Sequence, residues 1–200
     1  MGFFTKALAQ PLLLAAAVAS LWWAPDACAA SLQESLRERV ETCAACHGAD
    51  GNSALEKIPS LAGQPEFFTM NQLILMREGV RPVEAMAAFV KDLKDDDIVA
   101  LAGYFAQQPP KRTDEALDPA RVKAGEALST QLRCASCHLP SLGGHEQMPR
   151  LAGQRVDYMF DAMKAYRDNT RAGADTQMSA VVYGLSDAQI DALAHYAASR

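Results

Sequence analysis

Apolar residues recur every three or four positions in three stretches of each half of the chain. The first stretch carries Leu32, Leu36, Val40 and Cys43, a spacing that places them on one face of a helix. The same spacing predicts five further helices, over residues 66–77, 95–107, 120–134, 156–167 and 187–199. No stretch alternates apolar and polar residues for long enough to predict a strand. The pattern therefore predicts an all-α fold.

The last helix of each half has a recognisable start. Ser186 is followed three positions later by Gln189, which is the sequence of a capping box. In the first half, residues 95–97 are three aspartates, and acidic side chains are favourable at the positive end of the helix dipole. We therefore expect these two helices to begin at Asp95 and Asp187.

The second half of the chain repeats the first. Residues 59–64 (PSLAGQ) return as residues 149–154 (PRLAGQ), identical at five of six positions, and residues 95–106 match residues 187–198 at seven of twelve. The offset changes only from 90 to 92 residues, which indicates tandem copies of one domain. Between the copies, the polar and proline-bearing residues 107–114 predict an extended linker.

This organisation predicts two small domains. We expect residues 31–110 to form the first domain, residues 111–117 the linker and residues 118–200 the second domain. A domain of roughly 80 residues has a marginal apolar core on its own. A group buried inside each domain would add the missing contact surface.

Such a group is indicated by a pentapeptide that occurs twice, as Cys43 to His47 (CAACH) and Cys134 to His138 (CASCH). Cys43 and Cys46, like Cys134 and Cys137, are three residues apart, so on a helix both thiols of a pair lie on one face with the histidine beside them. This arrangement suits two thioether bonds to one porphyrin and an imidazole on its iron. The two motifs predict two covalently bound c-type haems.

Other roles for these cysteines fit the sequence less well. A zinc ribbon has its two cysteine pairs about 15–20 residues apart, whereas 87 residues separate Cys46 from Cys134. A thioredoxin-like pair belongs to a strand-rich fold and does not require the histidine. Structural disulfides would not place every cysteine beyond residue 30 in the same five-residue pattern.

Methionines at equivalent positions are the candidate sixth ligands of the two irons. Met86 lies 39 residues after His47 and Met178 lies 40 residues after His138, and a thioether is a soft ligand that suits haem iron. The repeat offset of 92 residues superposes these two methionines. Met76 is a nearby competitor of Met86 in the first half.

The remaining histidines and methionines lack a counterpart in the other half. His145 and His195 do not recur under the repeat alignment, which favours ordinary surface or helix histidines. Met70, Met148, Met159 and Met163 also lack one, and they read as core or loop residues, which is the usual role of methionine.

The repeated PxLAGQ segments contain no side chain that could act as a nucleophile in both copies. One interpretation is that the carbonyl groups of Pro59 and Pro149 accept hydrogen bonds from Nδ1 of His47 and His138 and so fix the imidazole tautomer. The other interpretation is a rigid turn in which a glycine supplies unusual backbone angles. The two interpretations are compatible.

The first 30 residues predict a cleaved secretory signal peptide. They carry one lysine, an apolar run over residues 12–23 and a small-residue end at residues 27–30, and the run is shorter than the roughly 20 residues that span a bilayer. Removal of these residues leaves four cysteines, all in the haem motifs, and no tryptophan. We therefore expect a periplasmic protein.

Charge excludes one class of partner. Residues 31–110 hold 7 basic and 12 acidic side chains, and residues 111–200 hold 11 of each. No basic patch of the kind that binds nucleic acid is indicated. The acidic first half instead predicts docking to a basic partner.

At this point the chain resembles the two-haem bacterial class I cytochromes c of the cytochrome c4 type. The resemblance rests on the paired CxxCH motifs, the PxLAGQ segments, the methionine about forty residues later, and the LSD and LAxY sequences around the last helix, present at residues 185–187 and 193–196. The first copy departs from the LSD pattern with Leu93, Lys94 and Asp95, which affects helix capping more than ligation.

The resemblance implies a ligand set for each haem. The first haem would be bound by Cys43 and Cys46, with His47 and Met86 as axial ligands. The second would be bound by Cys134 and Cys137, with His138 and Met178 as axial ligands. It also implies two haem domains related by a pseudo-twofold axis, each wrapped around its haem.

The same resemblance implies a periplasmic electron carrier, often loosely associated with the membrane, that feeds a terminal acceptor such as an oxidase and has redox proteins as partners and no organic substrate. An alternative is the dihaem electron-accepting subunit of a larger dehydrogenase, such as a flavin-linked sulfide dehydrogenase. A dihaem peroxidase would require one iron able to open, and the matched methionines argue against it.

Overall fold

The computed structural model describes residues 1–2, 24–173 and 175–200, with the backbone alone between residues 24 and 33. The described chain divides into two units, Met1–Ser35 and Leu36–Arg200. Most of the predicted signal peptide lies outside the described residues, so it stays a prediction. No helix among the described residues is long and apolar enough to span a bilayer.

The all-α prediction is confirmed, since the described residues form helices and contain no strand, apart from one isolated bridge between His145 and Met148. The helices of the first half are α1 (Ala24–His47), α2 (Glu66–Arg77), α3 (Glu84–Val90) and α4 (Asp95–Ala106). Those of the second half are α5 (Pro119–Gln131), α6 (Ala135–His138), α7 (Val156–Arg167), α8 (Thr176–Val182) and α9 (Asp187–Ala198).

The helix expected over residues 120–134 is divided in two, which corrects the prediction. Helix α5 ends at Gln131 because Arg133 adopts a left-handed backbone angle, with φ of 57°, and a run of α-helix cannot pass through such a residue. The short helix α6 then carries the end of the second CxxCH motif. In the first half, α1 continues unbroken to His47.

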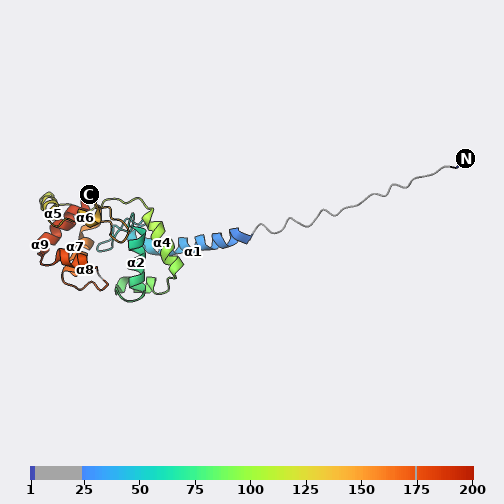
Figure 1. Ribbon diagram of the computed structural model, residues 1–200, viewed down its shortest axis with the longest axis horizontal. Helices are drawn as coiled ribbons and strands as arrows, with labels where there is room; N and C mark the ends of the chain where they lie inside the picture. The colour runs from blue at the N-terminus through green and yellow to red at the C-terminus, as the bar shows by residue number, and fades with distance from the viewer. Residues whose placement is uncertain (3–23, 174) are drawn as a thin grey trace. The chain divides into compact units, whose positions relative to one another are not determined.

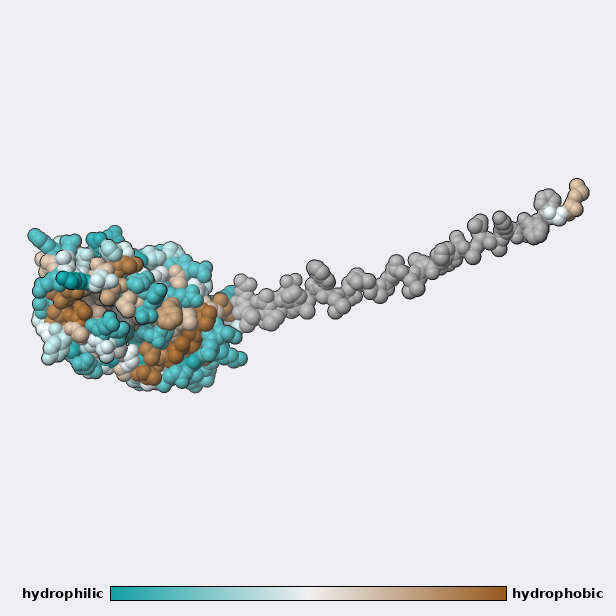
Figure 2. Space-filling view, in the orientation of Figure 1, coloured by the Kyte–Doolittle hydropathy of each residue, from teal (hydrophilic) through white to brown (hydrophobic). Residues whose placement is uncertain are grey.

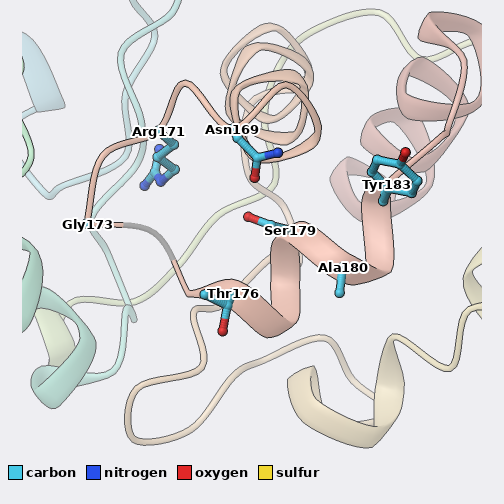
Figure 3. Close-up of a pocket in the computed structure, with 7 residues that line it drawn as sticks. All are labelled: Asn169, Arg171, Gly173, Thr176, Ser179, Ala180 and Tyr183. Atoms are coloured by element: carbon cyan, nitrogen blue, oxygen red, sulfur yellow. The ribbon is translucent and has the colours of Figure 1, made fainter.

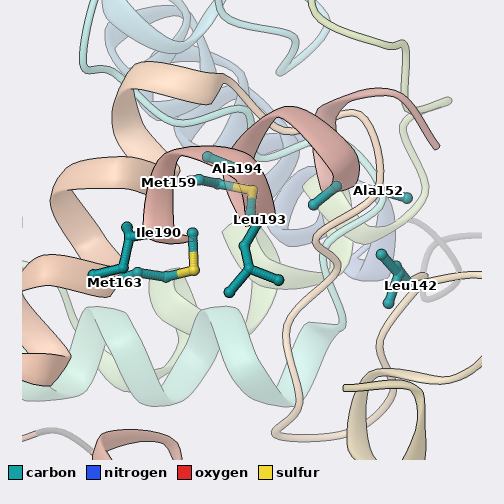
Figure 4. Packing of buried hydrophobic residues seen from close by; sticks show 8 residues of the cluster. Leu142, Ala152, Met159, Met163, Ile190, Leu193 and Ala194 are labelled. Carbon is teal, nitrogen blue, oxygen red and sulfur yellow. The ribbon is translucent and has the colours of Figure 1, made fainter. Parts of the chain in front are cut away.

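Each half packs around its own apolar cluster. Helix α2 packs on α4 in the first half, and α5 and α7 pack on α9 in the second (Figure 1). The first cluster is centred on Ile98, Leu101 and Phe105 of α4, and the second on Ile190 and Leu193 of α9. Figure 4 shows Met159 and Met163 of α7 meeting Ile190 and Leu193 in the second cluster.

The turn between the CxxCH motif and the next helix is built alike in both halves. The carbonyl of Gly51 accepts the N–H groups of Leu61 and Ala62, at 2.7 and 2.9 Å. The carbonyl of Leu142 accepts the corresponding pair of N–H groups in the second half, at 2.8 and 3.0 Å. These bonds fold each PxLAGQ segment back over the end of its CxxCH motif.

Candidate haem sites

The two motif histidines are buried and held by equivalent hydrogen bonds. His47 and His138 are 6 % and 7 % exposed. Nδ1 of His47 lies 2.8 Å from the carbonyl oxygen of Pro59, and Nδ1 of His138 lies 2.9 Å from that of Pro149. A carbonyl can only accept, so Nδ1 carries the proton in both rings and Nε2 keeps its lone pair. The interpretation of the prolines as hydrogen-bond partners is confirmed.

The interpretation of these segments as glycine turns is confirmed as well. Gly63 and Gly153 have φ of 65° and 73°, in the region that side chains rarely adopt. A Cβ atom on Gly63 would lie 2.9 Å from the ring of Pro110, and one on Gly153 would lie 2.9 Å from the carbonyl oxygen of Lys111. The two turns therefore need glycine both for their backbone angles and for the close approach of the segment between the halves.

Burial keeps both imidazoles in the form that binds metal. Desolvation lowers the pKa of His47 and of His138, while the hydrogen bonds to the proline carbonyls oppose the shift. A lowered pKa favours the neutral ring near pH 7. A neutral imidazole with a fixed Nδ1–H is suited to bind iron through Nε2.

The four motif cysteines are unpaired and reachable. Cys43 and Cys134 are half-buried, and Cys46 and Cys137 are exposed. Burial raises the pKa of the Cys43 thiol. In the second motif, the N–H groups of Cys137 and His138 both bond to the carbonyl of Cys134, at 3.3 and 3.0 Å. One helical turn therefore survives there although α5 has ended.

Met86 and Met178 occupy equivalent places on two short helices that the apolar spacing did not predict. Met86 lies on α3 and Met178 on α8, and both are half-buried against the cluster of their own half. Three residues later on the same helix face, Phe89 and Val181 are 50 % and 40 % exposed. Each short helix thus presents a thioether beside an apolar surface that a flat, apolar group could cover.

Met70 and Met76 of α2 pack against the same apolar cluster as Met86, whereas the other candidates lie in the second half. Met76 is half-buried on α2, whereas Met159 and Met163 are buried in the second core. His195 is buried in α9, and its Nδ1 accepts the N–H of Asp118 at 3.2 Å, which holds the start of α5. His145 is exposed.

Two arginines at equivalent repeat positions supply a further test of whether a haem fits. Arg81 is hydrogen bonded to Gln72 at 2.7 Å, and both its burial and the charge of Arg171 lower its pKa. Arg171 stacks on the ring of Tyr166, 4.9 Å from its centroid. In the described part of the chain, the groups that contact Arg81 and Arg171 are neutral or positively charged. A negatively charged group such as a haem propionate would therefore offset the repulsion between the two arginines.

One hollow of the surface is lined by none of the predicted site residues. It has a volume of about 470 Å³. Figure 3 shows the seven residues around it, which lie on α8, on the loop before it or just after its end: Asn169, Arg171, Gly173, Thr176, Ser179, Ala180 and Tyr183. Figure 2 shows apolar side chains (brown) reaching the surface at several other places on the face drawn.

Comparisons with known proteins point in the same direction. Residues 29–105 match the family model described as cytochrome c oxidase, cbb3-type, subunit III, and residues 122–199 match the model described as cytochrome c. Cytochrome c4 of Pseudomonas aeruginosa is 35 % identical over 169 residues, which cover 79 % of this chain and 83 % of the relative. A thiosulfate dehydrogenase electron acceptor of Thiomonas intermedia is 31 % identical over 202 residues, 94 % of this chain and 90 % of the relative.

Solved structures resemble the chain over the same length. Reduced recombinant cytochrome c4 from Pseudomonas stutzeri has a TM-score of 0.76 and 32 % identity, covering 83 % of this chain and 97 % of that one. Thiosulfate dehydrogenase from Marichromatium purpuratum has a TM-score of 0.71 and 28 % identity, covering 82 % of this chain and 40 % of that one. The latter structure is thus much longer than the region it shares.

Proposed function

We propose that this chain, which belongs to the cytochrome c4 family, holds its haems with two equivalent sets of residues. The protein binds two c-type haems and is an electron-transfer protein rather than an enzyme. Its redox partners are proteins. The observation that carries the proposal is the pair of buried histidines, each with Nδ1 fixed on a proline carbonyl beside two free thiols.

The first set consists of Cys43 and Cys46, which form the thioether bonds, and of His47 and Met86, which are the axial ligands. The imidazole is already neutral and oriented, and α3 holds the methionine on the same apolar cluster as the end of α1. Both residues that would bind the iron are therefore held in place by the folded chain.

The second set consists of Cys134 and Cys137, with His138 and Met178 as axial ligands. Bound haem supplies an iron that takes up and releases one electron at a time. If His138 and Met178 both bind this iron, the neutral thioether would favour the ferrous state and no position would be left for oxygen or peroxide. This arrangement suits electron transfer and argues against the peroxidase alternative.

We also propose the division into residues 31–110, a linker over 111–117 and residues 118–200, with residues 1–30 as a signal peptide for export to the periplasm. The two family matches, which end at residue 105 and begin at residue 122, support a boundary in this region. The separate apolar clusters of the two halves support it too.

The donor side has a specific candidate. One relative named as a thiosulfate dehydrogenase electron acceptor aligns with 94 % of this chain, and part of a thiosulfate dehydrogenase structure shares the fold. We propose a dehydrogenase of this kind as the electron donor, in line with the alternative of a dehydrogenase subunit. The test mixes the oxidised holoprotein with thiosulfate, with and without a thiosulfate dehydrogenase. Reduction only in the presence of the dehydrogenase would support this donor, and no reduction in its presence would exclude it.

The ligand sets can be tested on holoprotein from a host that matures c-type cytochromes. Wild-type protein should contain two low-spin haems and show the weak near-infrared band of a sulfur-to-iron bond. Met86→Ala and Met178→Ala should each lose about half of this band and open one iron to carbon monoxide. Met76→Leu is the matched control and should keep the full band; loss of the band in Met76→Leu instead would reassign the first ligand.

A further inference from the structure

Two glutamines connect the halves of the chain by reciprocal hydrogen bonds. Oε1 of Gln64 accepts the N–H of Arg150 at 3.0 Å, and its Nε2 donates to the Arg150 carbonyl at 2.9 Å. Gln154 makes the same pair of bonds with the backbone of Ser60, at 2.8 and 2.9 Å. Both side chains are buried. A backbone N–H can only donate and a backbone carbonyl can only accept. These contacts therefore fix which end of each glutamine amide is the oxygen and which is the nitrogen.

These bonds follow the internal repeat. Gln64 and Gln154 are the last residues of the two PxLAGQ segments, and Ser60 and Arg150 occupy the variable position x. Each glutamine therefore crosses to the backbone of the equivalent residue in the other half. The variable position tolerates serine and arginine because its backbone, rather than its side chain, makes the contact.

The peptide group that each glutamine contacts is the one that holds the axial histidine. The carbonyl of Pro59 accepts from His47 at 2.8 Å, while the N–H of the same peptide group, on Ser60, donates to Gln154 at 2.8 Å. In a conjugated peptide group, a bond at the N–H makes the carbonyl oxygen a stronger acceptor. The chain of groups from His47 thus ends on the glutamine of the other half.

The second half mirrors this chain of groups. The carbonyl of Pro149 accepts from His138 at 2.9 Å, and the N–H of Arg150 donates to Gln64 at 3.0 Å. Other contacts also join the halves: the N–H of Lys57 donates to Asp157 and the N–H of Phe68 to the carbonyl of Glu146, each at 3.0 Å. These contacts do not involve a peptide group that bonds to a motif histidine.

We propose that Gln64 and Gln154 are crossed positioning residues, each of which lowers the reduction potential of the haem in the opposite half. The inference rests on the proposed function, since it takes His47 and His138 as iron ligands. A stronger acceptor at Nδ1–H makes an imidazole a more basic ligand, which stabilises ferric iron. Gln154 acts in this way on the haem held by His47, and Gln64 on the haem held by His138.

The test compares Gln154→Met and Gln64→Met holoproteins with the control Gln108→Met. The side chain of Gln108 donates to the carbonyl of Tyr104 at 3.1 Å, and among the described residues it makes no hydrogen bond to either proline peptide group. The potentials come from a redox titration in which NMR signals of the two histidine rings assign each step to its haem. Gln154→Met should raise the ferrous-to-ferric ratio of the first haem roughly two- to fourfold at a fixed potential.

The expected pattern is crossed. Gln154→Met should leave the reduction potential of the second haem unchanged. Gln64→Met should raise the reduction potential of the second haem alone, and Gln108→Met should change neither potential. The proposal would be overturned if a variant changed the reduction potential of the haem in its own half, changed both potentials equally, or changed neither. Absence of the sulfur-to-iron band in wild-type protein would instead contradict the proposed ligands.

A measurement on wild-type protein covers the case in which a variant does not fold. Gln154→Met carries this risk, because Oε1 of Gln154 also accepts the N–H of Arg155 at 3.0 Å. Ferric iron makes Nδ1–H a stronger donor, so the bonds from Ser60 and Arg150 to the glutamines should strengthen on oxidation. Their amide protons should exchange with solvent more slowly in oxidised than in reduced protein, and equal rates would overturn the proposal.

Discussion

Gly125 of α5 lies against the backbone carbonyl of Ala192 in α9, so closely that a methyl group on Gly125 would overlap the carbonyl oxygen. It would also lie 2.7 Å from Cβ of Tyr196. The glycine is buried inside a helix, where it costs about 1 kcal/mol of helix propensity relative to alanine. The close contact of the two helices is the physical reason for this residue.

Gly125→Ala should therefore lower the free energy of unfolding by about 1–3 kcal/mol, because α5 must move away from α9. Gly103→Ala is the matched control, since the atoms nearest to a Cβ there would be those of the Glu66 carboxyl group, no closer than 3.8 Å. This control should be neutral or stabilising by up to about 1 kcal/mol. Denaturant unfolding of the holoproteins measures both, and equal losses would show that the α5 and α9 contact is not the cause.

Lys111, just after the first half, pairs with Asp50 beside the first haem motif. The hydrogen bond from Lys111, and then those from Asn52, lower the pKa of Asp50 to about 2 from its ordinary 3.8. A carboxyl group with a lowered pKa in the folded state stabilises the fold above its ordinary pKa and loses this effect as pH falls towards the folded value.

Lys111→Met should accordingly destabilise the protein at pH 7, by less than about 1 kcal/mol because the pair is largely exposed. The difference from wild type should shrink as the pH falls from 3.8 towards 2. Urea unfolding at several pH values measures the trend. Lys91→Met is the control, because it removes a looser pair with Asp92 at 3.9 Å. If the loss of unfolding free energy in Lys111→Met grew as the pH fell, the pair with Asp50 would not be its cause.

Helix α9 begins with a complete capping box. Oγ of Ser186 accepts the N–H of Gln189 at 3.2 Å, and the N–H of Ser186 donates to Oε1 of Gln189 at 2.9 Å. Ser186→Ala should cost about 0.5–2 kcal/mol of stability.

The equivalent position of α4 is Lys94, whose N–H bonds to Asp97 at 2.9 Å. Lys94→Ser would add the hydroxyl acceptor that the first half lacks and should stabilise by up to about 1 kcal/mol. Thermal unfolding of both variants compares the two helix starts. If Ser186→Ala unfolds like wild type, the capping box contributes nothing measurable.

The uneven charge of the chain should be visible in the kinetics of its electron transfer. Residues 31–110 carry all of the acidic excess, so the rate of reaction with a basic redox protein should fall as ionic strength rises. Stopped-flow mixing over a range of salt concentrations measures the slope. With an acidic partner the slope should reverse or vanish, and a rate insensitive to salt with every partner would remove the docking prediction.

The apolar spacing located α2, α4, α7 and α9 to within a residue or two, because each of these helices presents an apolar face to the core of its own half. It missed α3 and α8, which have seven residues each and are too short for a periodic signal. The equal distances of Met86 and Met178 from their histidines nevertheless marked the same places. The break of the helix at Arg133 was not foreseen, because a left-handed arginine has no signature in sequence.

Some features of the candidate site were likewise predictable from the sequence and others were not. The paired CxxCH motifs carry their chemistry within five residues, so a single sequence indicates it. The hydrogen bonds from His47 and His138 to the proline carbonyls were only one of two interpretations, since they join residues 12 and 11 positions apart. The crossed contacts of Gln64 and Gln154 were not predicted at all.

The sequence by itself determined the helical class, the repeat, the two haem motifs and the matched methionines, because each is a matter of local spacing or of similarity between two segments. Only the tertiary structure decided which groups of one half meet those of the other. Gln64 and Arg150 are 86 residues apart, and Gln154 and Ser60 are 94. Contacts over such separations depend on how two folded halves pack, and nothing in the spacing of residues along the chain encodes that packing directly.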